Sequence, residues 1–149
     1  MSREICTKQV SVFLENKAGR LADVCDLLGR SGLNIRALCI ADTSDFGILR
    51  LIVNDPGRAV ELLRGDGHSV GETDVLAIQI EDKPGGLSHV LDVMRPYTVN
   101  VEYMYAFVTP LEGQAVVIFR VVDDNLDNTI KALAEANIAV VNPDKVYSM

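Results

Sequence analysis

The first half of the chain switches between two hydrophobic periods, one typical of strands and one typical of helices. Apolar residues at every second position predict a half-buried strand over residues 9–14. Apolar residues at helical spacing predict a helix over residues 21–28, which Gly32 ends. Two β-rich segments follow at 35–41 and 48–53. The polar residues between them predict a hairpin: Asp42, Thr43, Ser44 and Asp45.

A second helix and a last strand complete this series of elements. Pro56 suits the first position of a helix, whose apolar side contains Ala59, Leu62 and Leu63. Residues 68–72 predict a short strand. The order of elements is therefore strand, helix, strand, strand, helix, strand.

The same series occurs twice. Glu-Asn-Lys-Ala-Gly-Arg-Leu at residues 15–21 returns as Glu-Asp-Lys-Pro-Gly-Gly-Leu at residues 81–87. The apolar residues of the preceding strands correspond as well: Val10 with Leu76, Val12 with Ile78 and Leu14 with Ile80. The second copy predicts elements at 76–80, 87–95, 101–108, 115–122, 126–136 and 138–141. We therefore predict two domains, residues 1–74 and 75–149.

This order of elements is that of the ferredoxin-like fold, so the sequence predicts an α+β protein with two βαββαβ units in tandem. In each unit, two helices cover one face of an antiparallel sheet, and the other face is normally polar. Apolar residues nevertheless occupy the phase that we assign to this other face: Leu38, Ile40, Met104, Val116 and Ile118. We expect sheet-on-sheet or edge contact to cover them, either between the repeats or in a dimer.

Charge and composition narrow the classes of function. Hydrophobic residues make up 48% and charged residues 23% of the 149 residues, as in a globular protein, and the net charge of −7 disfavours binding to phosphate backbones. The aromatic residues Tyr103, Tyr105 and Phe107 take the phase that we assign to the helices, which is not that of an RNA-stacking platform. We expect no nucleic-acid partner.

The chain shows no signal for a membrane or for secretion. No apolar run approaches the roughly 20 residues of a spanning helix, and residues 1–5 lack the apolar stretch of a secretory signal. The three cysteines, Cys6, Cys25 and Cys39, do not suggest a disulfide framework, because their number is odd. We expect a cytoplasmic protein with reduced thiols and no membrane partner.

The residues that most often carry catalysis are not arranged for it here. Cys25 lies on the apolar side of a predicted helix, and Cys39 lies on a predicted strand, where packing is the expected role. His68 and His89 are not repeated, and no carboxylate pair or metal-ligand spacing accompanies them. We predict no catalytic residue, no metal and no cofactor, with a small ferredoxin-like enzyme as an alternative.

The repeated turn between the first strand and first helix of each copy is a candidate binding element. Gly19 permits a sharp turn there, and the N–H groups at a helix start attract a carboxylate or another anion. Asn16 adds a hydrogen-bond donor and an acceptor beside it. The alternative is that Asn16 and Asp82 only cap their helices.

With these turns in place, the chain resembles ACT domains in tandem. The resemblance rests on two copies of strand, [Asn/Asp]-Lys-[Ala/Pro]-Gly-x-Leu and helix, each followed by Asn34-Ile35 or Asn100-Val101, and it covers nearly the whole chain. It implies the ferredoxin-like fold and a small regulatory module that binds amino acids at interfaces between paired domains.

The resemblance also implies a set of ligand-binding residues. The two turns would hold the head group of the amino acid: Asn16, Lys17, Ala18, Gly19, Arg20 and Leu21, and Asp82, Lys83, Pro84, Gly85, Gly86 and Leu87. Asn34 and Asn100 would contribute from a facing domain. The pocket walls would come from the second strands: Leu38, Cys39, Ile40, Met104 and Tyr105.

Two residues depart from the family pattern. Ala18 stands at the usual position of proline, and Asp82 at the usual position of asparagine, where it would repel a ligand carboxylate. The first copy is therefore the expected stronger site. The resemblance implies a regulatory protein without catalysis of its own, as a homodimer or beside a separately encoded metabolic enzyme. A ligand-free assembly subunit is the alternative.

Overall fold

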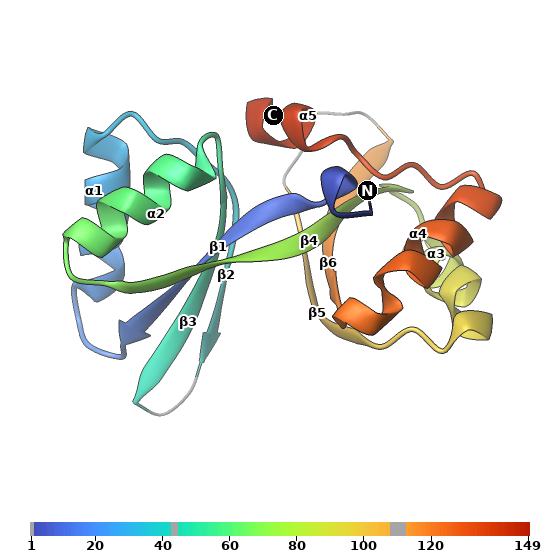
Figure 1. Cartoon of the computed structure of the whole chain (residues 1–149), viewed down its shortest axis with the longest axis horizontal. Helices are drawn as coiled ribbons and strands as arrows, with labels where there is room; N and C mark the ends of the chain where they lie inside the picture. Colours follow the sequence, from blue (N-terminus) through green and yellow to red (C-terminus); the bar gives the residue numbers. More distant parts are fainter. Residues whose placement is uncertain (1, 43–44, 108–112) are drawn as a thin grey trace. The chain divides into compact units, whose positions relative to one another are not determined.

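The computed structural model describes residues 2–42, 45–107 and 113–149 of the chain (Figure 1). These residues form two compact units. We call Lys8–Thr73, with Ser148, the first unit, and we call residues 2–7, Asp74–Tyr147 and Met149 the second unit. Each unit has the ferredoxin-like arrangement of strands and helices, which confirms the predicted α+β fold.

The first unit places two helices on an antiparallel sheet. Its strands lie in the order β2-β3-β1, and β3 pairs with both neighbours. The elements are β1 (Thr7–Glu15), α1 (Arg20–Arg30), β2 (Ile35–Asp42), β3 (Phe46–Val53) and α2 (Pro56–Gly65). Figure 1 shows α1 and α2 on the same face of these strands.

Local sequence explains where the helices of the first unit begin and end. Pro56 opens α2, and the side chain of Asp55 accepts a hydrogen bond from the Arg58 N–H at 3.2 Å. After the C-terminal end of α1, Gly32 has φ +75°, and the Leu33 N–H donates to the Leu28 carbonyl at 2.9 Å. The predicted end of this helix is confirmed.

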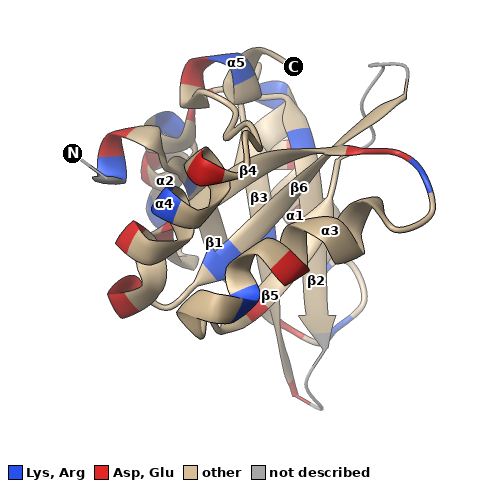
Figure 2. Ribbon diagram, turned by 90° about the vertical axis from the view of Figure 1, so that its right-hand side faces the viewer, with Lys and Arg blue, Asp and Glu red and all other residues tan. Residues whose placement is uncertain are grey.

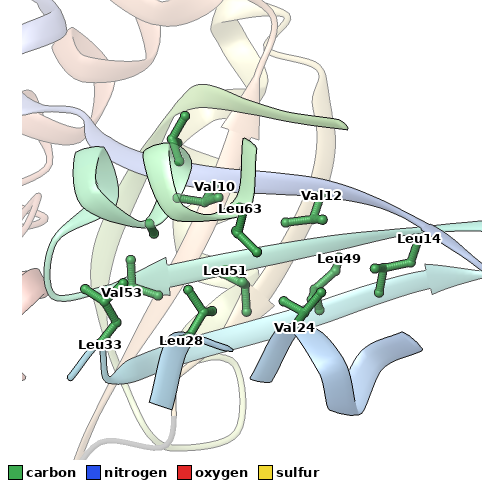
Figure 3. Packing of buried hydrophobic residues seen from close by; sticks show 12 residues of the cluster. Val10, Val12, Leu14, Val24, Leu28, Leu33, Leu49, Leu51, Val53 and Leu63 are labelled. Carbon is green, nitrogen blue, oxygen red and sulfur yellow. The ribbon is translucent and has the colours of Figure 1, made fainter. Parts of the chain in front are cut away.

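The core of the first unit lies between the helices and the sheet (Figure 3). Leu28 of α1 and Leu63 of α2 are completely buried there. The alternating strand residues point into the same core: Val10, Val12, Leu14, Leu49, Leu51 and Val53. The period of two along these strands therefore reflects burial on one face.

The second unit repeats this plan, but its last strand is reduced to an isolated bridge between Ile78 and Val140. Its strands lie in the order β4-β6-β5, with β6 antiparallel to both. The elements are β4 (Ser69–Glu81), α3 (Gly86–Met94), β5 (Val101–Ala106), β6 (Gln114–Val121), α4 (Leu126–Glu135) and α5 (Pro143–Ser148). Short 3-10 turns occur at Ser2–Ile5, Arg95–Tyr97 and Asp123–Asn125.

The start of the chain packs with the second unit. Cys6 is buried in its core together with Phe119 and Leu133, and Ile5 packs against them. Arg3 forms an ion pair with Asp74 and lies 3.6 Å from a carboxylate oxygen of Asp123. The predicted limits of 1–74 and 75–149 place these first residues with the first repeat, whereas their contacts are with the second.

Three elements differ from the prediction. The predicted strands 68–72 and 76–80 form the single strand β4, which begins in the first unit and ends in the second. The predicted strand 138–141 is only an isolated antiparallel bridge between Ile78 and Val140. Helix α5 was not predicted; Asn142 caps it by accepting from the Asp144 N–H at 2.9 Å.

The strand β2 presents its side chains in the opposite phase from the prediction. Leu38 lies opposite Leu51 and Ile40 opposite Leu49, and both of those partners belong to the helix-side core. Leu38 and Ile40 are therefore on the helix side, at the exposed edge of the sheet. An irregularity in register between Ile35 and Ala37 shifts the alternation by one residue, which a strict period of two cannot anticipate.

A similar irregularity reverses the phase of β5. Met104 lies opposite Phe119 and packs against the helix-side core, whereas Tyr105 lies opposite Ile118 on the other face. The assignment of Met104 to the open face was wrong. So was that of Tyr103, Tyr105 and Phe107 to the helix side, because a register shift between Val101 and Tyr103 displaces the alternation.

Other expectations have simpler outcomes. Val116 and Ile118 do lie on the face away from the helices, and both are buried. Cys6, Cys25 and Cys39 form no disulfide bond within the described part of the chain. In the predicted hairpin, Thr43 and Ser44 lie outside the described residues. No helix within the described ranges is long and apolar enough to cross a membrane.

Candidate functional site

The turn that follows β4 has acidic and then basic residues, coloured red and then blue on the ribbon of Figure 2. The Lys83 N–H donates to the Glu81 carbonyl at 3.0 Å, and the Gly86 N–H donates to the Lys83 carbonyl at 3.0 Å. Gly85, which directly precedes Gly86, is the N-cap of α3 and has φ +84°. This left-handed conformation suits glycine, so the predicted sharp turn is confirmed.

Gly86 is packed so closely that the turn requires a second glycine. A Cβ atom at this position would lie 2.1 Å from the Glu81 carbonyl oxygen. Because that oxygen belongs to the backbone, a side chain at Gly86 fits only if the turn opens. The glycine pair thus fixes the position of Glu81 and Lys83 relative to the start of α3.

The start of α3 offers donors beside this turn. The His89 N–H makes the first helical bond, to the Gly85 carbonyl at 2.9 Å. The N–H groups of Leu87 and Ser88 precede that bond at the positive end of the helix dipole. Such a terminus favours an anion.

Glu81 and Lys83 form an ion pair in this turn, with 2.5 Å between a carboxylate oxygen and Nζ. The hydrogen bond and positive charge of Lys83 hold the pKa of Glu81 below its usual value, and His89 adds a smaller effect in the same direction. Glu81 is therefore an anion at neutral pH. The turn presents one anion and one cation side by side.

A pocket of about 610 Å³ opens at this turn. Its lining combines the turn, the end of β4 and the segment after α4: Gln79, Ile80, Glu81, Lys83, Pro84, Gly85, Gly86, His89, Val90, Gln114, Ala136, Asn137, Ile138 and Ala139. We call it the turn pocket. Six of these fourteen residues are polar or charged, and the volume lies in the range of small-molecule sites.

The segment after α4 is held against β4 by backbone bonds. The Gln79 N–H donates to the Ala139 carbonyl at 3.0 Å, and the Val141 N–H donates to the Ala77 carbonyl at 2.7 Å. Asn137 ends α4 with φ +57°, a conformation that asparagine tolerates better than most residues. These contacts fix the wall of the turn pocket opposite α3.

The corresponding turn of the first unit has the same backbone. Gly19 is the N-cap of α1 with φ +87°, and the Lys17 N–H donates to the Glu15 carbonyl at 2.8 Å. Lys17 Nζ lies 2.9 Å from a Glu15 carboxylate oxygen. Asn16 lies three residues before the N-cap, so it does not occupy the capping position that the alternative assigned to it.

A second pocket lies elsewhere on the first unit. It has about 520 Å³, and its described lining residues are all charged or titratable: Arg20, Asp23, Asp26, Arg30, Asp66 and His68. The His68 Nε2 lies 3.4 Å from an Asp66 carboxylate oxygen. Apart from Arg20, none of the predicted ligand-binding residues is among those that the structure places in this lining.

The comparisons with known proteins decide the family. The family described as the ACT domain pair matches residues 5–149. The chain belongs to this family. The resemblance read from the two glycine turns is thereby confirmed.

Solved structures agree with this family. This ACT domain pair is 38% identical to a protein of Bacteroides thetaiotaomicron with a known crystal structure. The alignment covers 99% of each chain, with a TM-score of 0.92. It shares the fold of the regulatory subunit of aspartate kinase from Thermus thermophilus, at 15% identity, TM-score 0.64, and coverage of 87% of this chain and 91% of that one. The corresponding subunit from Thermus flavus is 14% identical with a TM-score of 0.60 and coverage of 87% and 92%. No curated protein matches.

Within the ACT domain pair, only part of the predicted site comes together. Lys83, Pro84, Gly85 and Gly86 all line the turn pocket. Asn100, Met104 and Tyr105 are not among its described lining residues, because β6 separates β5 from β4. Asp82 instead uses its backbone N–H to bond the Gly113 carbonyl at 3.0 Å, as Asn16 bonds the Asp45 carbonyl at 2.9 Å.

The paired asparagines have a structural role in each unit. The Asn34 N–H donates to Asn54 Oδ1 at 2.9 Å, and the Asn100 N–H donates to Asn125 Oδ1 at 3.1 Å. In the first unit, the 11 residues of α1 separate Asn34 from Gly19, about 16 Å along the helix axis. A contribution of Asn34 and Asn100 to binding from a facing domain stays a prediction.

Ten described lining residues of the turn pocket were not predicted as ligand-binding residues: Gln79, Ile80, Glu81, His89, Val90, Gln114, Ala136, Asn137, Ile138 and Ala139. Gln79 stands between Ile78 and Ile80, and a polar residue on a strand usually indicates a solvent-facing position. The available signal was the repeat itself, because the first copy has Phe13 where the second has Gln79.

Proposed function

We propose that this protein is an amino-acid-binding regulatory protein without catalysis of its own, and that the amino acid binds in the turn pocket of the second unit. The observation that carries the proposal is the ion pair of Glu81 and Lys83, which lies in a pocket at the start of α3. The ACT domain pair family supports the regulatory role.

The charges of the turn suit the head group of an amino acid. The ligand carboxylate would bind Lys83 and the N–H groups at the start of α3, and the ligand ammonium would bind Glu81. Ligand binding thus replaces the mutual ion pair with two pairs to the ligand. The departure at Asp82 does not oppose this arrangement, because Asp82 is not among the described lining residues.

Regulation requires a partner for the signal. The Thermus neighbours are regulatory subunits of aspartate kinase, and we propose by analogy that this chain acts on a separately encoded metabolic enzyme. We also propose a homodimer. Leu38 and Ile40 on the edge strand β2 are half exposed, at 50% and 52%, and an edge strand of this kind is suited to pairing with another copy.

Calorimetric titration with the twenty common amino acids tests the proposal. We expect at least one to bind the unmodified chain. Lys83→Met keeps the length of the side chain and removes its charge, so it should weaken this binding about 10- to 100-fold through loss of a charge-assisted hydrogen bond.

The first unit supplies a matched control. Lys17 has the same place in its turn and the same ion pair, with Glu15. Because the proposed pocket lies in the second unit, Lys17→Met should leave the dissociation constant unchanged. The proposal fails if no amino acid binds, or if Lys17→Met weakens binding and Lys83→Met does not.

A further inference from the structure

Two glutamine side chains meet where both line the turn pocket. Gln79 Nε2 donates to Gln114 Oε1 at 3.3 Å, and both side chains are partly buried. Among the described residues, this is the one hydrogen bond of either side-chain amide. One amide oxygen and one amide nitrogen therefore remain available to a ligand, and this holds whichever way the two amides are oriented.

The first unit has phenylalanine at both equivalent positions. Gln114 lies opposite Glu81 in the β-ladder, and Phe46 lies opposite Glu15, which is the counterpart of Glu81 in the repeat. Phe13 is two residues before Glu15, as Gln79 is before Glu81. Both phenylalanine residues are 55% exposed.

The two turns differ at the tightly packed glycine as well. Arg20 stands at the position of Gly86, and its guanidinium lies 3.9 Å from Asp23, the counterpart of His89. The first unit thus keeps the ion-paired turn but replaces the amide pair and the second glycine. Similar backbones carry side chains of different chemistry.

We infer that Gln79 and Gln114 select the side chain of the bound amino acid, and that one ligand binds per chain, in the second unit. The favoured ligand is an amino acid with an uncharged side chain that carries both a donor and an acceptor, such as an amide or a hydroxyl group. This inference rests on the proposed function. The amide pair presents the matching acceptor and donor, and Glu81 and Lys83 are used by the head group.

An apolar ligand of equal size is disfavoured by desolvation. It would cover the free amide oxygen and nitrogen without offering hydrogen bonds, and a site built for hydrogen bonds discriminates strongly against such a ligand. We expect glutamine or asparagine to bind at least about tenfold more tightly than methionine or leucine.

The test compares three proteins by calorimetry with glutamine, asparagine, methionine and leucine. The first is the unmodified chain, for which we expect one polar ligand per chain. The second carries Gln79→Met and Gln114→Met, which keep side-chain length and remove all hydrogen bonding. In this variant the preference for the polar ligands should fall at least about tenfold, and methionine or leucine should bind more tightly than before. The third carries Phe13→Gln and Phe46→Gln, which should leave affinity and stoichiometry unchanged.

The outcomes separate this inference from the proposed function. If no amino acid binds the unmodified chain, the proposed function fails. If an amino acid binds but the variant with Gln79→Met and Gln114→Met keeps the same preference, the selection by Gln79 and Gln114 is wrong. Two ligands per chain, or altered binding in the variant with Phe13→Gln and Phe46→Gln, would refute the assignment to the second unit. Circular dichroism of each variant ensures that a folded protein is compared.

Discussion

Gly86→Ala is expected to lower the free energy of unfolding by about 1–3 kcal/mol and to weaken amino-acid binding roughly 5- to 150-fold. The new Cβ atom would lie 2.1 Å from the Glu81 carbonyl oxygen, so the turn must open to accept it. An open turn moves Lys83 relative to the start of α3. A ligand that binds only to the closed turn must force the alanine side chain back towards the Glu81 carbonyl oxygen. The free energy needed for this lowers the affinity of the ligand.

A glycine without a close neighbour is the control for this variant. Gly29 lies within α1, and no atom outside its own helix lies within 4 Å of the position that its Cβ would take. Gly29→Ala should stabilise the protein by about 0.5–1 kcal/mol, because alanine favours a helix more than glycine does. Urea unfolding gives both changes in free energy, and calorimetry gives both affinities. Equal stability of the two variants would show that the turn tolerates a side chain at residue 86.

Deleting residues 2–6 is expected to destabilise the second unit by about 2–4 kcal/mol. The deletion removes Cys6, which is 4% exposed, and Ile5 from the core around Phe119. It also removes Arg3, the ion-pair partner of Asp74, whose side chain is only 8% exposed. Hydrogen exchange of backbone amides measures the effect in each unit separately.

The expected pattern for this deletion is faster exchange in β4, β6 and α4, with little change in the core of the first unit. Glu4→Ala is the control within the same segment, because Glu4 is exposed and its loss should change stability by less than about 0.5 kcal/mol. Faster exchange confined to the first unit would mean that the N-terminal segment belongs to that unit instead.

The sequence predicted the fold well because the fold depends on patterns that occur twice. Val10, Val12 and Leu14 alternate as their counterparts in β4 do, and all of them face a helix-side core. The glycine turns were recognisable because the backbone before each helix takes a left-handed conformation, which glycine adopts most readily, as at Gly19 and Gly85. The repetition of both features distinguished them from chance.

The faces of the edge strands were not predictable in this way. A single register irregularity near Ile35 and another near Val101 reverse the side to which the rest of each strand points. The packing of Cys6 with the second unit was also beyond a local pattern, because it joins residues that are distant in sequence. Both features depend on tertiary contacts.

The candidate site was predicted only where its residues are adjacent in the sequence. Lys83, Pro84, Gly85 and Gly86 belong to one turn, so a local motif identifies them. Gln79, Gln114 and Ala139 come from three segments, and only strand pairing brings them together. The greater strength expected of the first copy rested on a like charge at Asp82. We now propose the second copy, where Asp82 is not among the described lining residues.

Nuclear magnetic resonance of the isotope-labelled chain, titrated with the amino acid that binds most tightly, tests the site directly. We expect the largest changes in amide chemical shift at Lys83, at Gly85–Ser88 and at Asn137–Ala139, because these residues hold the head group and form the opposite wall. The same titration should leave the amides of Asn16–Leu21 nearly unchanged. Changes concentrated at Asn16–Leu21, or no changes with any amino acid, would contradict a ligand site in the second unit.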